Sequence, residues 1–314
     1  ARIMMAGMGR RGFTRGWRFA PWTVGGVVAA AGAAALALAL SNPAPPVQLA
    51  SQVPPREIPT DWASPGEPAA PVAQPDGDPP GLPVPYETAG QLVLVADGKP
   101  FGEEAYELHV TSDGALLTSS GRFWFKVVLA TVRVTFEQTL EAGGDLRPTR
   151  YAAAFHAPLG LDRSVRATIA GGHAAVERSG KTEEIEVDAE RAFALGTFST
   201  YALIPRVFAL RQANGSASFD ALVFGGPPSQ ESSAAADELP TVSVTLAGRA
   251  RLRAETGSVD ADRYHLAGPF GESDLYARGG EFLALHAAGE EGDLLVYRSD
   301  FFPSGVEIDP APSP

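Results

Sequence analysis

Hydrophobic and polar residues alternate along most of the chain from Gly90 onward, in short runs that end at turn residues such as Asp97-Gly98 and Gly279-Gly280. The alternation is clearest at 130–140 and 241–254. A period of two places apolar side chains on one face of a β-sheet. The pattern therefore predicts an all-β domain over residues 89–309, an antiparallel curved sheet or half-barrel of about 10–12 strands, followed by a tail at 310–314.

One short segment has helical rather than strand spacing. Its apolar positions are Tyr201, Ile204, Val207, Phe208 and Leu210. Ser199 or Thr200 is expected to cap this helix, and Asn214-Gly215 follows its end. We expect a single capping helix near 200–211 that covers the concave apolar face of the curved sheet.

The N-terminal region has the charge pattern of a membrane anchor. Residues 1–20 contain five arginines and no acidic residue, and residues 21–40 carry no charge. Twenty residues span about 30 Å as a helix, the thickness of the hydrocarbon core of a bilayer. Because arginine is enriched on the cytoplasmic side, we expect a transmembrane helix at 21–40 in the inner membrane, with a cytoplasmic N-terminus and a periplasmic bulk.

Two alternatives to a simple anchor stay open. Arg10-Arg11 with Phe13 resembles a twin-arginine export signal, although paired arginines also serve only as a topology signal. Ala37-Leu38-Ala39 would suit a signal peptidase, so cleavage is the alternative to a retained helix.

Small residues recur on one face of the expected membrane helix, at Gly25, Gly26, Ala29, Ala30 and Ala33. Such a face lets another helix backbone approach closely, so we expect packing against integral-membrane subunits. An Ala-rich composition alone would give the same pattern.

Residues 41–88 contain fourteen prolines, too many for a helix or a sheet. They predict an extended, polyproline-type stalk that could reach about 150 Å when straight. Its apolar residues are candidate anchors on a partner: Val47, Leu49, Val53, Ile58 and Trp62.

The amino-acid composition excludes several classes of partner and site. The formal net charge is −12, and an acidic domain is repelled by phosphate, which argues against nucleic acid. The chain has no cysteine, which excludes disulfides, thiolate metal sites and c-type haem attachment.

No catalytic constellation is recognisable. The five histidines are scattered at 109, 156, 173, 265 and 286, without the helical pair of a zinc site, and no Gly-x-Ser-x-Gly elbow or phosphate loop occurs. Acidic pairs such as Glu183-Glu184 and Asp260/Asp262 are what abundant acids produce by chance. We therefore predict no catalytic residue, no metal ligand and no cofactor.

The most suggestive surface feature is a basic ridge at Arg249, Arg251 and Arg253, since residues two apart share a strand face. It would dock an acidic partner, or cross-strand acids such as Glu184 or Glu186 would neutralise it.

Three stretches carry a family resemblance: residues 96–102, the pair Gly121 and Phe123, and the closing residues 293–300. They resemble an uncharacterised bacterial family of exported β-sheet proteins, which is similar in architecture to the periplasmic lipoprotein-carrier half-barrels. The resemblance covers about residues 90–305 and brings no catalytic residue. A lipoprotein carrier acts as a soluble shuttle. A chain tethered to the membrane differs from the carriers in this respect.

These expectations combine into a non-enzymatic, single-pass membrane-anchored periplasmic scaffold or accessory subunit of a photosynthetic, respiratory or envelope complex. Integral-membrane subunits would be its partners, through helix and stalk. The alternative is a module that binds a lipid or another hydrophobic ligand in the concave face of the β domain.

Overall fold

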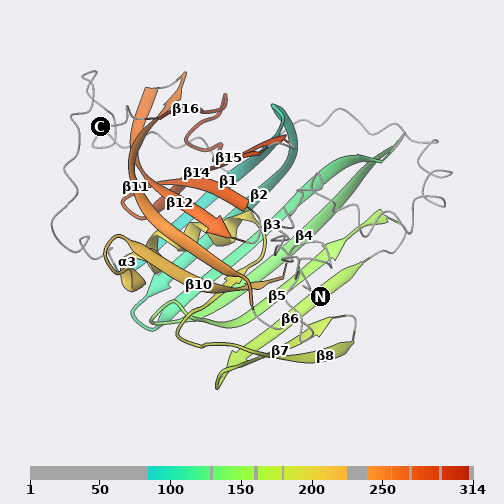
Figure 1. Ribbon diagram of the computed structural model, residues 1–314. Coiled ribbons are helices and arrows are strands. Elements are labelled where there is room, and N and C mark those ends of the chain that lie inside the picture. The colour runs from blue at the N-terminus through green and yellow to red at the C-terminus, as the bar shows by residue number, and fades with distance from the viewer. Residues whose placement is uncertain are drawn as a thin grey trace, which may run out of the picture.

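The computed structural model describes residues 84–127, 130–158, 162–178, 180–224, 239–255, 257–268, 271–289 and 292–310. Within these ranges the chain forms one sixteen-stranded sheet and a short helical segment (Figure 1). The first half of the sheet comprises β1 (Tyr86–Ala96), β2 (Lys99–Thr111), β3 (Gly114–Val127), β4 (Ala130–Gly143), β5 (Pro148–His156), β6 (Arg163–Ala170), β7 (His173–Arg178) and β8 (Lys181–Glu186). The second half comprises β9 (Ala192–Leu195), β10 (Ser216–Val223), β11 (Thr241–Ala254), β12 (Gly257–Gly268), β13 (Gly271–Arg278), β14 (Glu281–Gly289), β15 (Gly292–Arg298) and β16 (Glu307–Pro310).

In each half neighbouring strands are antiparallel and follow the sequence order, except that β9 and β10 are parallel. From β1 the sheet runs through β2 to β8 in sequence order, and from β15 it runs back through β14 to β9, while β16 pairs with β11. Tight hairpins produce this order: Asp97-Gly98, Gly171-Gly172 and Gly279-Gly280 all have two consecutive residues at positive φ, as two-residue hairpin turns require. The two halves meet where β1 pairs with β15, with Leu92 opposite Arg298. We call this junction the seam.

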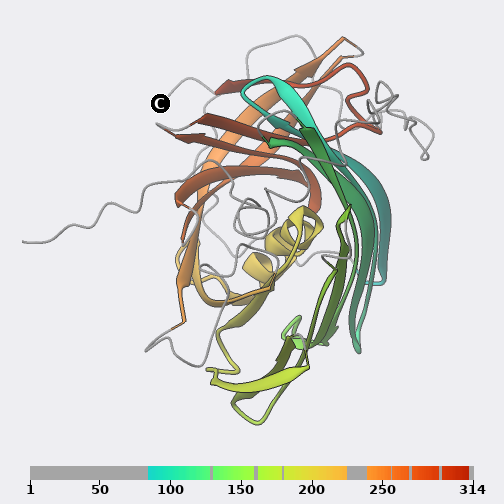
Figure 2. The ribbon, with the colours of Figure 1, turned by 90° about the vertical axis from the view of Figure 1, so that its right-hand side faces the viewer.

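The sheet curls around the helical segment (Figure 2). A 3-10 helix, η2 (Phe198–Leu203), continues directly into α3 (Ile204–Arg211). Ile204, Val207 and Phe208 are at most 3% exposed and belong to the main hydrophobic core. The predicted helix and its position on the concave face are therefore confirmed. We call residues 198–211 the plug.

The predicted helix cap was wrong. Ser199 and Thr200 lie inside η2, and neither helix has a side-chain cap. Pro205 lies at the start of α3, where its missing N–H costs no hydrogen bond.

A bulge in β11 divides the apolar residues between two cores. The register shifts between Leu246 and Gly248, and one extra residue reverses which face each later side chain occupies. Val242 and Val244 accordingly belong to the main core, whereas Ala250 and Leu252 belong to a second cluster. This second cluster includes Phe301, Phe302, Val306 and Ile308 from the C-terminal segment. The expectation of one continuous dry face along 241–254 was therefore wrong.

The prediction of an all-β curved sheet is confirmed, although sixteen strands replace the expected 10–12 because short strands such as β9 and β16 were not anticipated. The first strand begins at Tyr86, three residues before the expected boundary. In the described part of the chain no helix is long and apolar enough to cross a bilayer. The expected transmembrane helix at 21–40 lies outside the described residues.

Candidate functional site

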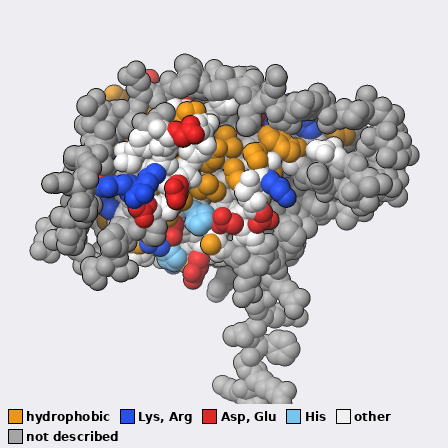
Figure 3. All heavy atoms as spheres, turned by 90° about the horizontal axis from the view of Figure 1, so that it is seen from above, with side chains coloured by type: hydrophobic (Ala, Val, Ile, Leu, Met, Phe, Trp, Pro, Cys, Tyr) orange, Lys and Arg blue, Asp and Glu red, His pale blue; other side chains and the backbone are white. Residues whose placement is uncertain are grey.

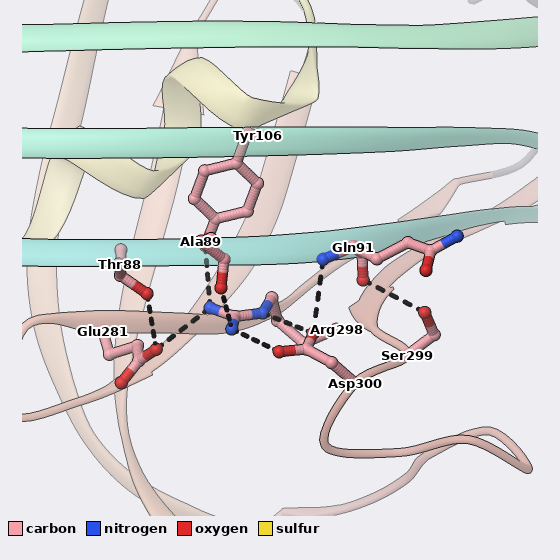
Figure 4. Close-up of polar contacts among 8 residues, drawn as sticks. All are labelled: Thr88, Ala89, Gln91, Tyr106, Glu281, Arg298, Ser299 and Asp300. Carbon is pink, nitrogen blue, oxygen red and sulfur yellow. Dashed lines mark hydrogen bonds and ion pairs between the residues drawn. The ribbon is translucent and has the colours of Figure 1, made fainter. Parts of the chain in front are cut away.

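A buried arginine lies at the seam, on the last residue of β15 (Figure 4). Arg298 is 0% exposed, and all five of its N–H donors have an acceptor. Its Nε and Nη2 donate to the two carboxylate oxygens of Asp300 at 2.7 and 2.5 Å. Nη1 donates to the Tyr106 hydroxyl at 2.8 Å and to Glu281 Oε1 at 3.1 Å, and Nη2 also reaches the Ala89 carbonyl at 2.8 Å.

The acids around Arg298 are held in turn by β1. The Thr88 hydroxyl donates to Glu281 Oε1 at 2.8 Å, and the Gln91 N–H donates to Asp300 Oδ1 at 3.3 Å. Burial alone would lower the pKa of Arg298, but Tyr106 and the hydrogen-bonded carboxylates of Asp300 and Glu281 raise it overall. Arg298 therefore stays charged. We call this group the seam network.

A glycine leaves the space that the seam network needs. A Cβ on Gly90 would lie 2.8 Å from Tyr106 Cε1 and would overlap the Arg298 guanidinium. The plug approaches the same region, where the Arg206 guanidinium lies 3.4 Å from the Tyr86 ring centroid. Burial lowers the pKa of Arg206, and the nearby Tyr86 and Glu281 oppose that shift.

A second buried network joins the plug to the first half of the sheet. Glu104 on β2 is 0% exposed. One carboxyl oxygen accepts the Thr197 hydroxyl at 2.5 Å, and the other accepts the Ser199 backbone N–H at 3.2 Å. Burial raises the pKa of Glu104, although these hydrogen bonds lower it in part. Burial therefore shifts the protonation equilibrium of Glu104 toward the neutral form.

Gln138 on β4 is the hub of this second network. Its Nε2 donates to the hydroxyls of Ser119 and Ser199 at 3.2 and 3.1 Å. Its Oε1 accepts the Tyr151 hydroxyl at 2.9 Å and the Thr197 N–H at 2.8 Å. We call Glu104, Gln138 and these partners the plug network. Both networks are too deeply buried to touch a substrate. They instead hold the plug and the neighbouring strands together.

The basic ridge predicted on β11 exists, but each arginine has an acidic partner. Arg249 and Arg251 pair with Asp262 and Asp260 of β12 at 3.4 and 2.9 Å, and Arg253 pairs with Asp309 of β16. The neutralising acids are thus these aspartates and not Glu184 or Glu186, which lie on β8 at the far edge of the sheet. A hollow of about 510 Å³ lies beside Arg253, between the end of β11 and residues 304–307.

Two histidines of the second half of the sheet are paired with acids. His265 Nδ1 lies 3.1 Å from Asp274 Oδ1, and Asp274 also accepts Arg263 at 2.8 Å. His286 Nε2 lies 2.6 Å from Asp293. Figure 3 shows histidine and acidic side chains beside a hydrophobic patch on the upper face. Among the described residues no group of three or more potential ligands is arranged to hold a metal ion.

His109, which the sequence places near several acids, pairs with Glu87 at 3.3 Å and lies 4.0 Å from Glu107. Two other carboxylates near it in the sequence have different partners: Glu103 pairs with Arg122, and Glu104 belongs to the plug network.

A row of aromatic rings crosses four strands of the first half of the sheet. Ring centroids are 6.4 Å apart for Phe101 and Phe123, 4.8 Å for Phe123 and Phe136, and 6.1 Å for Phe136 and Phe155. Phe136 is 1% exposed, while the other three are partly buried against the main core. We call these four residues the phenyl row. Sequence reasoning missed it, because adjacency across strands depends on register.

Two sets of predicted site residues lie outside the described part of the chain. These are the membrane-packing positions Gly25, Gly26, Ala29, Ala30 and Ala33, and the stalk anchors Val47, Leu49, Val53, Ile58 and Trp62.

Neither protein-family models nor curated proteins gave a match. Among solved structures, the chain is similar to a β-barrel-like protein of the domain of unknown function DUF1849 from Brucella abortus, at 10% identity and a TM-score of 0.43 over 72% of this chain and 98% of that one. It is also similar to a DUF1089 family protein from Pseudomonas aeruginosa, at 16% identity and a TM-score of 0.38 over 58% and 88% of the two chains.

Proposed function

We propose that this protein is a non-enzymatic accessory or scaffold subunit, anchored in the inner membrane by residues 21–40, whose β domain lies in the periplasm and docks to an integral-membrane complex. The proline-rich stalk, which ends before β1 begins at Tyr86, links anchor and domain. Its membrane partners are recognised through the small-residue face of the anchor and the apolar residues of the stalk.

This proposal rests on one observation: the interior of the β domain is filled by the plug and by hydrogen-bonded networks of its own side chains. The plug fills the concave face, with Ile204, Val207 and Phe208 at most 3% exposed. The most deeply buried ionisable groups, Arg298 and Glu104, are held in hydrogen-bonded networks. A domain built this way supplies a rigid frame and outer surfaces, which is what a scaffold needs.

The same observation makes a ligand-carrying half-barrel the less favoured function. A carrier needs room on its concave face for an apolar molecule, and the plug occupies the centre of that face. Mass spectrometry of an organic extract of the purified protein distinguishes the two: a stoichiometric lipid or pigment would favour the carrier.

Co-purification tests the scaffold directly. The full chain, extracted from its native membrane in mild detergent, is expected to bring a defined set of integral-membrane proteins with it. Replacing Gly25, Gly26 and Ala29 by leucine should release them, because leucine side chains keep another helix backbone at a distance.

Ala31→Leu with Ala35→Leu is the matched control, since these positions fall on the opposite side of the expected helix. A chain that purifies alone and monodisperse would overturn the scaffold. A mature N-terminus at Leu40 or later would overturn the anchor.

A further inference from the structure

The hairpin of β3 and β4 extends beyond both of its neighbouring strands. β2 pairs with β3 as far as Phe123, and β5 pairs with β4 as far as Thr135. Beyond these points β3 and β4 form four more pairs with each other, at residues 124–127 and 130–133. We call these residues the ribbon. Four strand pairs project about 13 Å past the last residue that β2 pairs with.

The ribbon lies in a basic and apolar stretch of an acidic protein. From Arg122 to Phe136, ten of the fifteen residues are hydrophobic, three are cations and none is acidic, whereas the whole chain has 37 acidic against 25 basic residues. One of the three cations, Arg122, pairs with Glu103 of β2. Burial raises the pKa of Glu103, and Arg122 and Arg133 both oppose that shift. The stretch and its neighbouring acid thus have an excess of two positive charges.

The two faces of this hairpin differ. Residues that are directly opposite each other share a sheet face. Trp124 is opposite Arg133, and the Arg122 guanidinium lies 5.9 Å from the centroid of the Trp124 ring, so this face carries a tryptophan between two cations. On the other face Val134 is 7% exposed, and the partly buried Val132 lies two residues nearer the tip. The apolar face of the hairpin therefore continues into the ribbon, which β2 and β5 no longer flank.

The surface of an anionic lipid bilayer fits these two faces. Elements that lie in the headgroup region present apolar residues to the acyl chains and lysine or arginine to the phosphates, and tryptophan is enriched at the boundary. A projection of about 13 Å exceeds the depth of about 5–10 Å at which such elements lie. The acids elsewhere in the domain do not cancel the attraction, because exposed charges more than about 8 Å apart are largely screened at physiological ionic strength.

We infer that the ribbon inserts into the interfacial region of an anionic bilayer, with Trp124 at the boundary and Arg133 against lipid phosphates. This contact goes beyond the proposed anchor and does not depend on it, because the ribbon belongs to the β domain. It gives the domain a fixed orientation, with the β3–β4 end of the sheet toward the membrane.

A chain anchored at 21–40 is able to make the same contact. The stalk enters the domain at the end of the sheet away from the ribbon, since Tyr86 pairs with Val110 at one end of the β1–β2 hairpin, while Trp124 Nε1 donates to the Pro100 carbonyl at the other. The fourteen residues of β3 cover about 45 Å. At about 3.1 Å per residue, residues 41–83 would cover about 130 Å. The stalk is therefore long enough to pass the whole length of the sheet.

Nitroxide labels on single cysteines test the contact, because the sequence has no cysteine of its own. Thr131→Cys lies at an exposed position of the ribbon, and Ser112→Cys lies at an exposed position in the turn at the other end of β3. The full chain is reconstituted in nanodiscs of equimolar phosphatidylcholine and phosphatidylglycerol. Power saturation compares collisions of each label with oxygen, which concentrates in lipid, and with a water-soluble nickel chelate. Oxygen should dominate at 131 and the nickel chelate at 112. Nickel-dominated collisions at both positions would overturn the inference.

The lipid charge and a matched pair of variants locate the attraction. In nanodiscs of phosphatidylcholine alone, and after Arg133→Gln in the mixed nanodiscs, the ratio of inserted to water-exposed ribbon should fall by about fivefold or more. Arg150→Gln is the control, since this 69% exposed side chain lies near the start of β5, away from the ribbon, and its loss should leave the ratio unchanged. Equal insertion with and without phosphatidylglycerol would overturn the inference, as would equal insertion of Arg133→Gln and wild type.

A third label separates this contact from the anchor. Ala35→Cys lies within the expected transmembrane helix at 21–40. Oxygen-dominated collisions at 131 with nickel-dominated collisions at 35 would overturn the anchor and support the ribbon contact. The reverse result would overturn the ribbon contact and support the anchor.

Discussion

The seam network and the plug network are both buried, but they differ in their charges: the first contains a cation among carboxylates, and the second contains a carboxyl group without a cation among its hydrogen-bond partners. At the seam, Arg298 faces Asp300 and Glu281 and keeps its charge among hydrogen-bonded carboxylates. Under the plug, Glu104 faces hydroxyl groups and backbone N–H groups with no cation among its hydrogen-bond partners, and its pKa is raised by burial.

The difference follows from what each network joins. The seam connects strands from the two ends of the domain, and an arginine with five donors binds groups from several strands at once. The plug network connects a helical segment to strands close beside it, where short hydroxyl and amide side chains reach. Loss of one member of the seam network is costly because the remaining charges stay buried without a partner, whereas loss of a hydrogen bond between hydroxyl and amide groups in the plug network costs less.

Removing the seam cation should have the largest effect. Arg298→Met leaves Asp300 and Glu281 buried without their counter-charge, and is expected to lower the unfolding free energy by about 3–5 kcal/mol. Urea denaturation measures this. Arg249→Met removes a solvent-exposed ion pair on β11 and should cost less than about 1 kcal/mol. Equal losses in the two variants would contradict a special role for the buried arginine.

Two hydroxyl deletions compare charged with neutral hydrogen bonding. Tyr106→Phe leaves one Arg298 N–H without an acceptor and should cost about 1.5–3 kcal/mol, as expected for a bond to a charged group. Tyr151→Phe removes the neutral bond to Gln138 and should cost about 0.5–1.5 kcal/mol. Thermal or urea unfolding of both variants tests the order, and a larger loss for Tyr151→Phe would reverse the comparison.

Added methyl groups probe how tightly each network is packed. Gly90→Ala overlaps Arg298, and Gly196→Ala brings a Cβ to 2.8 Å from Tyr151 Cε2. Each should cost about 1–3 kcal/mol through forced side-chain shifts. Gly143→Ala is the control, since its nearest neighbour would lie 3.4 Å away, at Asp145 Oδ1. A stable Gly90→Ala protein would show that the guanidinium has room to move.

For Glu104→Gln the expected effect depends on pH. Burial raises the folded-state pKa of Glu104 above its ordinary value of 4.5. The stability that the protonated carboxyl contributes is thus fully present below pH 4.5 and is lost as pH rises through the folded-state pKa. The variant should therefore gain stability relative to wild type as pH rises through the folded-state pKa.

Urea unfolding at several pH values measures that change. Glu183→Gln, on the exposed part of edge strand β8, is the matched control. Parallel profiles for wild type and Glu104→Gln would show that the buried carboxyl does not titrate differently in the folded protein.

Much of the fold was predictable because local rules determine it. Glycine-containing turns such as Asp97-Gly98 and Gly279-Gly280 mark the hairpins, and alternation at 130–140 marks a strand with one buried face. The β11 bulge was not predictable in the same way, because Ala250 and Leu252 keep the spacing of Val242 and Val244 while belonging to the other core. Only the pairing register reveals the reversal.

The buried networks were missed because they depend on contacts far apart in the sequence. Gln138, Glu104 and Arg298 each occupy a position in phase with the buried apolar residues of its strand, which is a local signal of a polar interior. Their hydrogen-bond partners, however, follow only from the strands and the plug that cover them. The phenyl row likewise needs the register of four strands.

The seam also constrains biosynthesis. Gln91 and Asp300, which share a hydrogen bond there, are 209 positions apart. Until the ribosome has released the last strands, the outer edge of β1 has no neighbour and presents free backbone groups to other nascent chains. Pairing of β1 with β15 is therefore expected late in folding, as contacts between distant residues generally are, and a chaperone would have its clearest target on β1.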